Sequence, residues 1–184
     1  DLGKTVIAAR EQADNVSGML VQPIIGAYMY LRALIGPEDL LYMFYDQPEV
    51  IHAVMQGWYE IADKAMSLIQ KHTWIDEIFV AEDICYNHGL LVSPDTIREF
   101  LMPFYQQLLT NSRSRQKHPL SFQVDTDGDC RPAIPIYNEL GMTKMSPFEV
   151  ASGCDVIESA KQYPDLIMSG GIDKRILAGG KDAI

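Results

Sequence analysis

Five short apolar runs, each followed by a segment with the apolar spacing of a helix, constrain the fold of this chain more than any other feature. Buried strands that alternate with helices are typical of parallel sheets with right-handed crossovers. No glycine-rich phosphate loop of either common pattern occurs, which disfavours the nucleotide-binding form of this architecture. We therefore expect an α/β fold that is part of a (β/α)8 TIM-type barrel, with about five βα units in this chain. The strands are expected at 19–25, 77–81, 120–124, 142–146 and 166–169.

Helix signals separate these strands. Ser93, followed directly by a proline, predicts a capped helix that runs on to residue 109 with a kink at Pro103. Asp46 is expected to cap a long helix that begins with the next few residues. Further helices are predicted over 2–15, 36–45, 131–140 and 155–163, and another is expected to begin after Asp173 and to continue to Ile184.

Acidic residues follow four of the five predicted strands. The stretch 120–129 ends in three carboxylates within five residues, and like charges that close are unfavourable unless a cation, a raised pKa or open solvent relieves them. A solvated turn is the simpler interpretation of this stretch alone. Because the carboxyl ends of parallel strands carry the active site in barrels, the four acidic groups together predict a site there. Its acidic members are Glu82, Asp83, Asp125, Asp127, Glu149 and Asp173.

Composition restricts the function classes. Fifteen basic against 25 acidic residues give a net charge of −10, which argues against nucleic acid or an anionic membrane as partner. The three cysteines, Cys85, Cys130 and Cys154, form no C-x-x-C pair, so we expect reduced thiols in a cytoplasmic protein and treat the last two as structural. The chain begins at Asp1 without a methionine, and we expect residues 1–184 to be one barrel domain that is incomplete at both ends.

Several segments, in this order, resemble the uroporphyrinogen decarboxylase superfamily. They are Gly36 to Glu49, Glu82-Asp83, Gly89-Leu-Leu-Val-Ser-Pro94, Arg98-Glu-Phe-Leu-Met-Pro-Phe-Tyr105, Asp127-Gly-Asp129, Gly141, Pro147-Phe-Glu149 and Gly170-Gly-Ile-Asp173. The resemblance implies a (β/α)8 barrel with its site at the carboxyl ends of the strands. It covers two branches: decarboxylases that act on uroporphyrinogen without a cofactor, and methyltransferases that use zinc and act between corrinoids, thiols and other acceptors.

The methyltransferase branch carries a His-x-Cys zinc pair where this chain has Asp125 and Asp127. Carboxylates are harder ligands, so this departure shifts the preference toward magnesium, manganese or a carboxylate-rich zinc site, which Glu82 or Glu149 could complete. The branch's further cysteine ligand would fall beyond Ile184. In the decarboxylase branch a hydroxyl residue follows the strand-end aspartate, where this chain has Ile84.

We favour metal-assisted methyl transfer linked to a corrinoid, with zinc or magnesium on Asp125 and Asp127. The alternative is cofactor-free decarboxylation of uroporphyrinogen, with an aspartate holding the pyrrole and Tyr28 or Tyr30 near it; a non-catalytic binding barrel is a second alternative. A small-molecule substrate, a corrinoid protein as partner and a homodimer are compatible with each catalytic hypothesis. Cys85 and His88 are either inert or ligands. The candidate catalytic residues are Asp83, Glu82, Tyr28 and Glu149, and the candidate cofactor-binding residues are Asp173 and Gly128.

Overall fold

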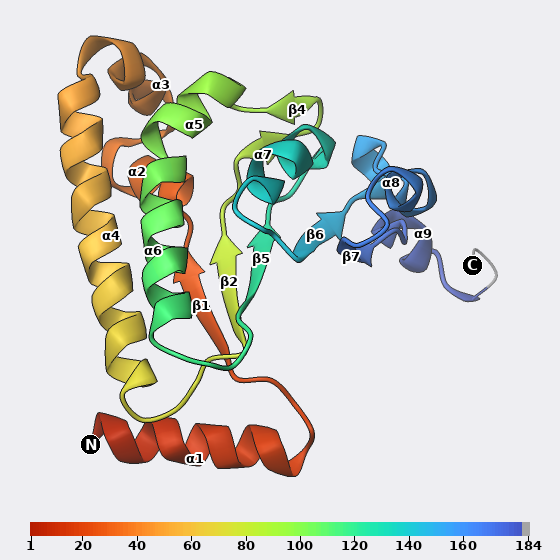
Figure 1. Cartoon of the computed structure of the whole chain (residues 1–184). Coiled ribbons are helices and arrows are strands. Elements are labelled where there is room, and N and C mark those ends of the chain that lie inside the picture. Colours follow the sequence, from red (N-terminus) through yellow and green to blue (C-terminus); the bar gives the residue numbers. More distant parts are fainter. Residues whose placement is uncertain (182–184) are drawn as a thin grey trace.

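The centre of the computed structural model, which describes residues 1–181, is a parallel five-stranded sheet (Figure 1). Its strands, in spatial order, are β1 (Val21–Ile25), β2 (Glu77–Ala81), β5 (Ser121–Asp125), β6 (Lys144–Phe148) and β7 (Ile167–Gly170). Each strand therefore lies beside the next one along the chain. A doubly wound sheet would reverse its order at a switch point, whereas a barrel winds in one direction. The order confirms an α/β fold compatible with part of a TIM-type barrel.

Helices connect the strands. Between β1 and β2 lie α2 (Ala27–Ile35), α3 (Pro37–Asp46) and α4 (Pro48–Gln70); between β2 and β5 lie the hairpin β3 (Cys85–Tyr86) and β4 (Gly89–Leu90), then α5 (Pro94–Phe100) and α6 (Met102–Ser114). The later connections contain η1 (Arg131–Ala133) and α7 (Ile134–Asn138), then η2 (Val150–Ser152) and α8 (Val156–Gln162). α9 (Lys174–Leu177) follows β7, and α1 (Leu2–Asn15) crosses below the ends at which β1, β2 and β5 begin (Figure 1).

One face of the sheet packs against the helices and forms the core. Ile78, Val80, Phe122 and Val124 alternate along β2 and β5 and are fully buried. A fully buried side chain of this size contributes roughly 1.5–3 kcal/mol to folding, so these positions hold the helices against the sheet. The indole of Trp58 on α4 also donates a 2.9 Å hydrogen bond to the carbonyl of Ile25, which ties that helix to the end of β1.

The opposite face of the sheet carries both polar and apolar side chains. Ile25, Ala81, Asp125 and Ser146 lie in register as one row across β1, β2, β5 and β6. Below this row, the ammonium of Lys144 on β6 lies 2.6 Å from a carboxylate oxygen of Glu77 on β2, an ion pair between two strands. Such rows of inward-pointing side chains are the way a barrel interior is built.

Several local predictions hold and others are wrong. Ser93 caps α5 by accepting from the amide of Thr96, as predicted. The expected continuous helix is in fact two, because the chain breaks at Leu101, and Pro103 lies in the first turn of α6 rather than at a kink. Asp46 is the last residue of α3; α4 is preceded by Gln47 and has no side-chain cap.

The helix predicted over 131–140 is divided into a 3-10 turn and a short α-helix. The strands predicted over 142–146 and 166–169 are observed slightly later in the chain. The last predicted helix is α9, and Ile184 lies outside the described residues. Across residues 1–181, no helix has the length and apolar character needed to cross a membrane.

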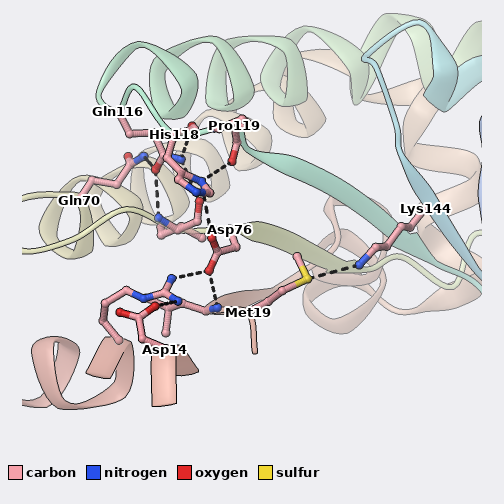
Figure 2. A network of polar contacts seen from close by, with 11 residues as sticks. Asp14, Met19, Gln70, Asp76, Gln116, His118, Pro119 and Lys144 are labelled. Carbon is pink, nitrogen blue, oxygen red and sulfur yellow. Dashed lines mark hydrogen bonds and ion pairs between the residues drawn. The ribbon is translucent and has the colours of Figure 1, made fainter. Parts of the chain in front are cut away.

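A polar network closes the end of the sheet at which the strands begin (Figure 2). Asp76, just before β2, accepts hydrogen bonds from the guanidinium of Arg10 on α1 and, at 2.7 Å, from the amide of Leu20. The same guanidinium reaches Asp14 at 2.5 Å, and His118 lies 3.6 Å from Asp76. Burial alone would raise the pKa of Asp76, but these donors outweigh burial and hold the pKa below its usual value.

Candidate functional site

The predicted acidic residues after β2, β5 and β6 do meet at one end of the sheet. The amide of Asp127 points at a carboxylate oxygen of Asp83 at 3.4 Å, and the amide of Gly128 donates a 2.8 Å hydrogen bond to Glu149. We call this region, formed by Asp83, Asp125, Asp127 and Glu149, the mouth. A hollow of about 130 Å³ opens beside it and is lined by Asp127, Pro147, Phe148, Glu149, Val150, Ala151, Gly170, Ile172, Asp173 and Lys174.

Asp125 and Asp127 are the mouth carboxylates that form no ion pair with a basic side chain among the described residues. Partial burial raises the pKa of Asp125, against a 2.5 Å hydrogen bond from the hydroxyl of Ser146 that lowers it. Burial also raises the pKa of Asp127, and the charges of Glu149 and Asp83 add to that effect. Both carboxylates therefore bind a proton more readily than usual.

Asp83 has a backbone conformation that few non-glycine residues adopt, with φ of +42°. Such strain is found where the surrounding structure holds a residue in place for a purpose. Its carboxylate lies 3.7 Å from the guanidinium of Arg32 on α2, and Arg32 also reaches the Asp83 carbonyl at 3.5 Å. Arg32 therefore holds the turn after β2 toward the mouth.

Glu149 holds two loops together. One carboxylate oxygen accepts from the ammonium of Lys174 at 2.6 Å, and the other accepts from the amide of Gly128. The bond from Lys174 is the main reason that the pKa of Glu149 is lowered. Gly128 has φ of +87°, and a side chain there would come within 2.6 Å of the backbone of Tyr86, so only glycine fits.

Glu82 lies below the mouth in the core, with none of its surface exposed. It accepts a 2.7 Å hydrogen bond from the amide of Tyr28 and a second from the hydroxyl of Tyr105, which itself accepts from the amide of Ala27. Burial raises the pKa of Glu82 to about 7, although these donors act to lower it. Glu82 and Tyr105 thus accept the first two amides of α2, whose N-cap residue makes no side-chain hydrogen bond.

This position differs from the one expected for a catalytic residue. Glu82 and the side chain of Tyr28 are both buried, the latter with 1% exposure, whereas Asp83 and Glu149 reach the mouth. The structure therefore gives Glu82 the role of fixing where α2 begins beside Asp83. The catalytic roles predicted for Asp83, Glu149, Glu82 and Tyr28 all stay predictions.

Asp173 follows β7 and caps α9 by accepting from the amide of Arg175 at 2.9 Å. Its carboxylate also pairs with the Arg175 guanidinium at 2.6 Å, and this hydrogen bond is the main reason its pKa is lowered to about 2. Asp173 is thus held by its own helix, next to Lys174, which reaches Glu149. Its role in cofactor binding stays a prediction, as does that of Gly128.

The metal prediction depends on ligands that converge. Within residues 1–181, no three side chains of histidine, cysteine, aspartate or glutamate are placed to hold a metal ion. Asp125 and Asp127 supply two carboxylates, and Glu82 cannot complete the set because both its oxygens are used in the core. The described residues do not form the zinc site that the resemblance implies, while two carboxylates are the set with which hydrated magnesium is often bound.

Sequence reasoning missed the side chains that hold the acidic groups in place. Arg32, Lys174 and Ser146 each contact a mouth carboxylate, and the hydroxyl of Thr126 accepts from the amides of Ile84 and Cys85 at 3.1 and 3.0 Å. Position was a signal for Thr126 and Lys174, which follow β5 and β7, whereas Ser146 lies in the middle of β6 and Arg32 in α2. His88 is exposed, and burial raises the pKa of the Cys85 thiol to about 12.

Comparison with known proteins gives a match in structure. No protein-family model matches the chain, and no curated protein matches its sequence. The structure is similar to a methyltransferase from Methanosarcina mazei, with a TM-score of 0.61 and 12% sequence identity over 91% of this chain and 57% of that one. The likeness is one of fold. This chain thus spans just over half the length of a methyltransferase with a similar barrel-type fold, and the superfamily stays a resemblance.

Proposed function

We propose that this chain is part of a barrel enzyme that transfers a methyl group, with a corrinoid as methyl donor or partner. The observation that carries the proposal is the state of Asp125 and Asp127. They lie at the mouth without a basic partner among the described residues, and the pKa of each is raised. The structural likeness to a methyltransferase supports this choice among the functions that a barrel can serve.

The chemistry follows from the raised pKa values. When a thiol accepts a methyl group, a carbon–sulfur bond forms, the bond to the donor breaks with its electron pair left on the donor, and the thiol loses its proton. A carboxylate of raised pKa is a better acceptor for that proton at neutral pH than an ordinary one. Asp127, the more exposed of the pair, is the proposed base, and Asp83 and Glu149 hold the loop around it.

In the metal-assisted form of the proposal, Asp125 and Asp127 would hold a divalent ion that activates the thiol as a Lewis acid, and Asp127 would then not act as the base. Two carboxylates suit a hydrated magnesium or manganese ion better than zinc, which prefers a closed set of nitrogen and sulfur ligands. The test is the metal content of the purified protein, compared with that of the double variant Asp125→Asn/Asp127→Asn. A bound divalent ion lost in the variant would support metal assistance, and equal content in both would contradict it.

The decarboxylase alternative is less well supported by the charges of the mouth. A substrate with many carboxylates needs free cations, yet Arg32 pairs with Asp83 and Lys174 pairs with Glu149. In the part of the chain that the structure describes, the mouth therefore presents unneutralised negative charge, which repels a polyanion.

Methyl transfer can be tested directly. The protein is mixed with methylcobalamin and a thiol, and loss of the cobalt-bound methyl group is followed by absorbance. We expect transfer by the wild type and a loss of about 100-fold in the double variant, as for removal of a general base. Asp165→Asn, an exposed carboxylate before the start of β7, is the matched control. No transfer by the wild type, together with decarboxylation of uroporphyrinogen, would overturn the proposal.

A further inference from the structure

Two cysteines that are far apart in sequence meet in the structure. The sulfur of Cys130, in the connection after β5, lies 3.9 Å from the sulfur of Cys154, in the connection after β6. Both are buried, with 0% and 2% exposure. No sequence pattern pairs these cysteines, because 24 positions separate them and neither belongs to a C-x-x-C motif.

Cys154 is near Cys130 on one side and also lines an open hollow at the surface. The hollow has a volume of about 380 Å³ and is lined by Val150, Gly153, Cys154, Asp155, Val156, Ile157 and Gly171. A small neutral oxidant such as hydrogen peroxide fits such a space. Cys130, with no exposed surface, lies behind Cys154 and is shielded from solvent.

We propose that Cys154 and Cys130 form a peroxide-sensitive thiol pair that closes to a disulfide. The sulfur of Cys154 attacks one oxygen of hydrogen peroxide, and the O–O bond of the peroxide breaks. One water leaves, and Cys154 becomes a sulfenic acid. The sulfur of Cys130 then attacks the Cys154 sulfur, an S–S bond forms and the sulfenic oxygen leaves as a second water. The two sulfurs together lose two electrons to the peroxide, and the two thiol protons end in the two waters.

The local backbone allows this closure. A disulfide has a sulfur–sulfur distance of about 2.05 Å, so the two sulfurs must approach by roughly 2 Å. Cys130 directly precedes η1, and Cys154 follows Gly153, which has φ of +80°, so both lie outside regular helices and strands. Burial raises the pKa of Cys130, which keeps it as a thiol until Cys154 has been oxidised.

The pair also adjoins the mouth. The Cys154 sulfur lies 3.6 Å from the carbonyl oxygen of Gly128 and 3.8 Å from Asp129, whose carboxylate is held by Arg131. Gly128 in turn donates its amide to Glu149. Movement of the Cys154 sulfur toward Cys130 therefore pulls on the loop that carries the proposed base, Asp127. This inference concerns the oxidation state of the protein and does not depend on the proposed reaction.

The test is a peptide map of the full protein after treatment with hydrogen peroxide. Free thiols are alkylated and the digest is analysed by mass spectrometry without reduction. We expect a peptide linked through Cys130 and Cys154, a fall from three free thiols to one, and full reversal by dithiothreitol. Thiols that all stay free, a disulfide that contains Cys85, or sulfinic acid at Cys154 without a disulfide would each overturn the proposal.

Two variants sharpen the result. Cys85→Ser is the matched control, since it removes the third buried thiol and is expected to leave the disulfide unchanged. In Cys130→Ser the sulfenic acid at Cys154 has no thiol to react with, and we expect it to be trapped by dimedone in at least tenfold greater yield than in the wild type. Equal trapping in both proteins would contradict the role of Cys130. If Cys130→Ser does not fold, the map of the wild type still decides.

Discussion

The two ends of the sheet carry the same kinds of residue in opposite arrangements. Where the strands begin, Asp76 accepts from Arg10 and from a backbone amide, and its pKa is lowered (Figure 2). Where they end, Asp125 and Asp127 have no basic partner among the described residues, and the pKa of each is raised. A paired carboxylate stabilises the fold, whereas unpaired neighbouring carboxylates cost stability and persist where they serve another purpose.

The largest effect is expected for Asp76→Asn. The change leaves the buried guanidinium of Arg10 with Asp14 as its remaining carboxylate and weakens the tie between α1 and the sheet. Breaking one partner of such a pair costs about 3 kcal/mol. We expect the free energy of unfolding, measured with urea at pH 7, to fall by that amount. A change as small as that of the exposed control Asp165→Asn would show that the two ends do not differ in this way.

Gly128→Ala should be nearly as damaging to stability, although it lies at the mouth. The added methyl group would come within 2.6 Å of the Tyr86 backbone, and φ of +87° is unfavourable for alanine. Overpacking together with this strain costs about 2–3 kcal/mol. Gly57→Ala is the control, because it lies in α4 and a methyl group there meets nothing within 4 Å. Equal melting temperatures for the two variants would contradict the close approach.

The raised pKa of the buried Glu82 carboxyl should make the stability of the fold depend on pH. Its pKa is about 7 in the folded protein against 4.5 ordinarily, so between these values the unfolded chain releases a proton that the folded protein retains. The free energy of unfolding should therefore fall as pH rises from about 4.5 to 7, by roughly 3 kcal/mol from this group, and stay low above that. Glu82→Gln should remove this fall. An unchanged slope in urea titrations at several pH values would show that Glu82 is not the group responsible.

The smallest stability effect is expected for Asp127→Asn. The variant removes repulsion from Glu149 and Asp83 and breaks no ion pair, so the free energy of unfolding should rise by about 0.5 kcal/mol or stay unchanged. Thermal unfolding beside the wild type measures it. A loss of more than 1 kcal/mol would mean that the mouth contributes to stability in the way that Asp76 does.

The parts of the fold that depend on local sequence patterns could be predicted from the sequence. The helix at 2–15, the cap at Ser93 and the five strands follow from spacing and turn chemistry, and all are observed within a few residues. The order of the strands follows from the alternation of strands and helices, since right-handed crossovers leave few choices.

Contacts between distant residues were beyond such reasoning. Glu82 and Asp83 point to the core and toward the mouth because the alternation of β2 continues through them, but the contacts of Glu82 with the start of α2 and with Tyr105 come from distant parts of the chain. The break at Leu101 and the pairing of Cys130 with Cys154 likewise depend on packing between elements rather than on local pattern. The residues that hold the mouth, such as Arg32, become recognisable only when α2 is placed beside β2.

The most direct test of the account compares methyl transfer in Asp127→Asn and Asp76→Asn with that in the wild type, under conditions where each protein is folded. We predict that Asp127→Asn lowers the rate of transfer from methylcobalamin to a thiol by about 100-fold with little change in stability. Asp76→Asn should lower stability and leave the rate per folded molecule unchanged. Equal rates for Asp127→Asn and the wild type would contradict the claim that the mouth carboxylates perform the chemistry.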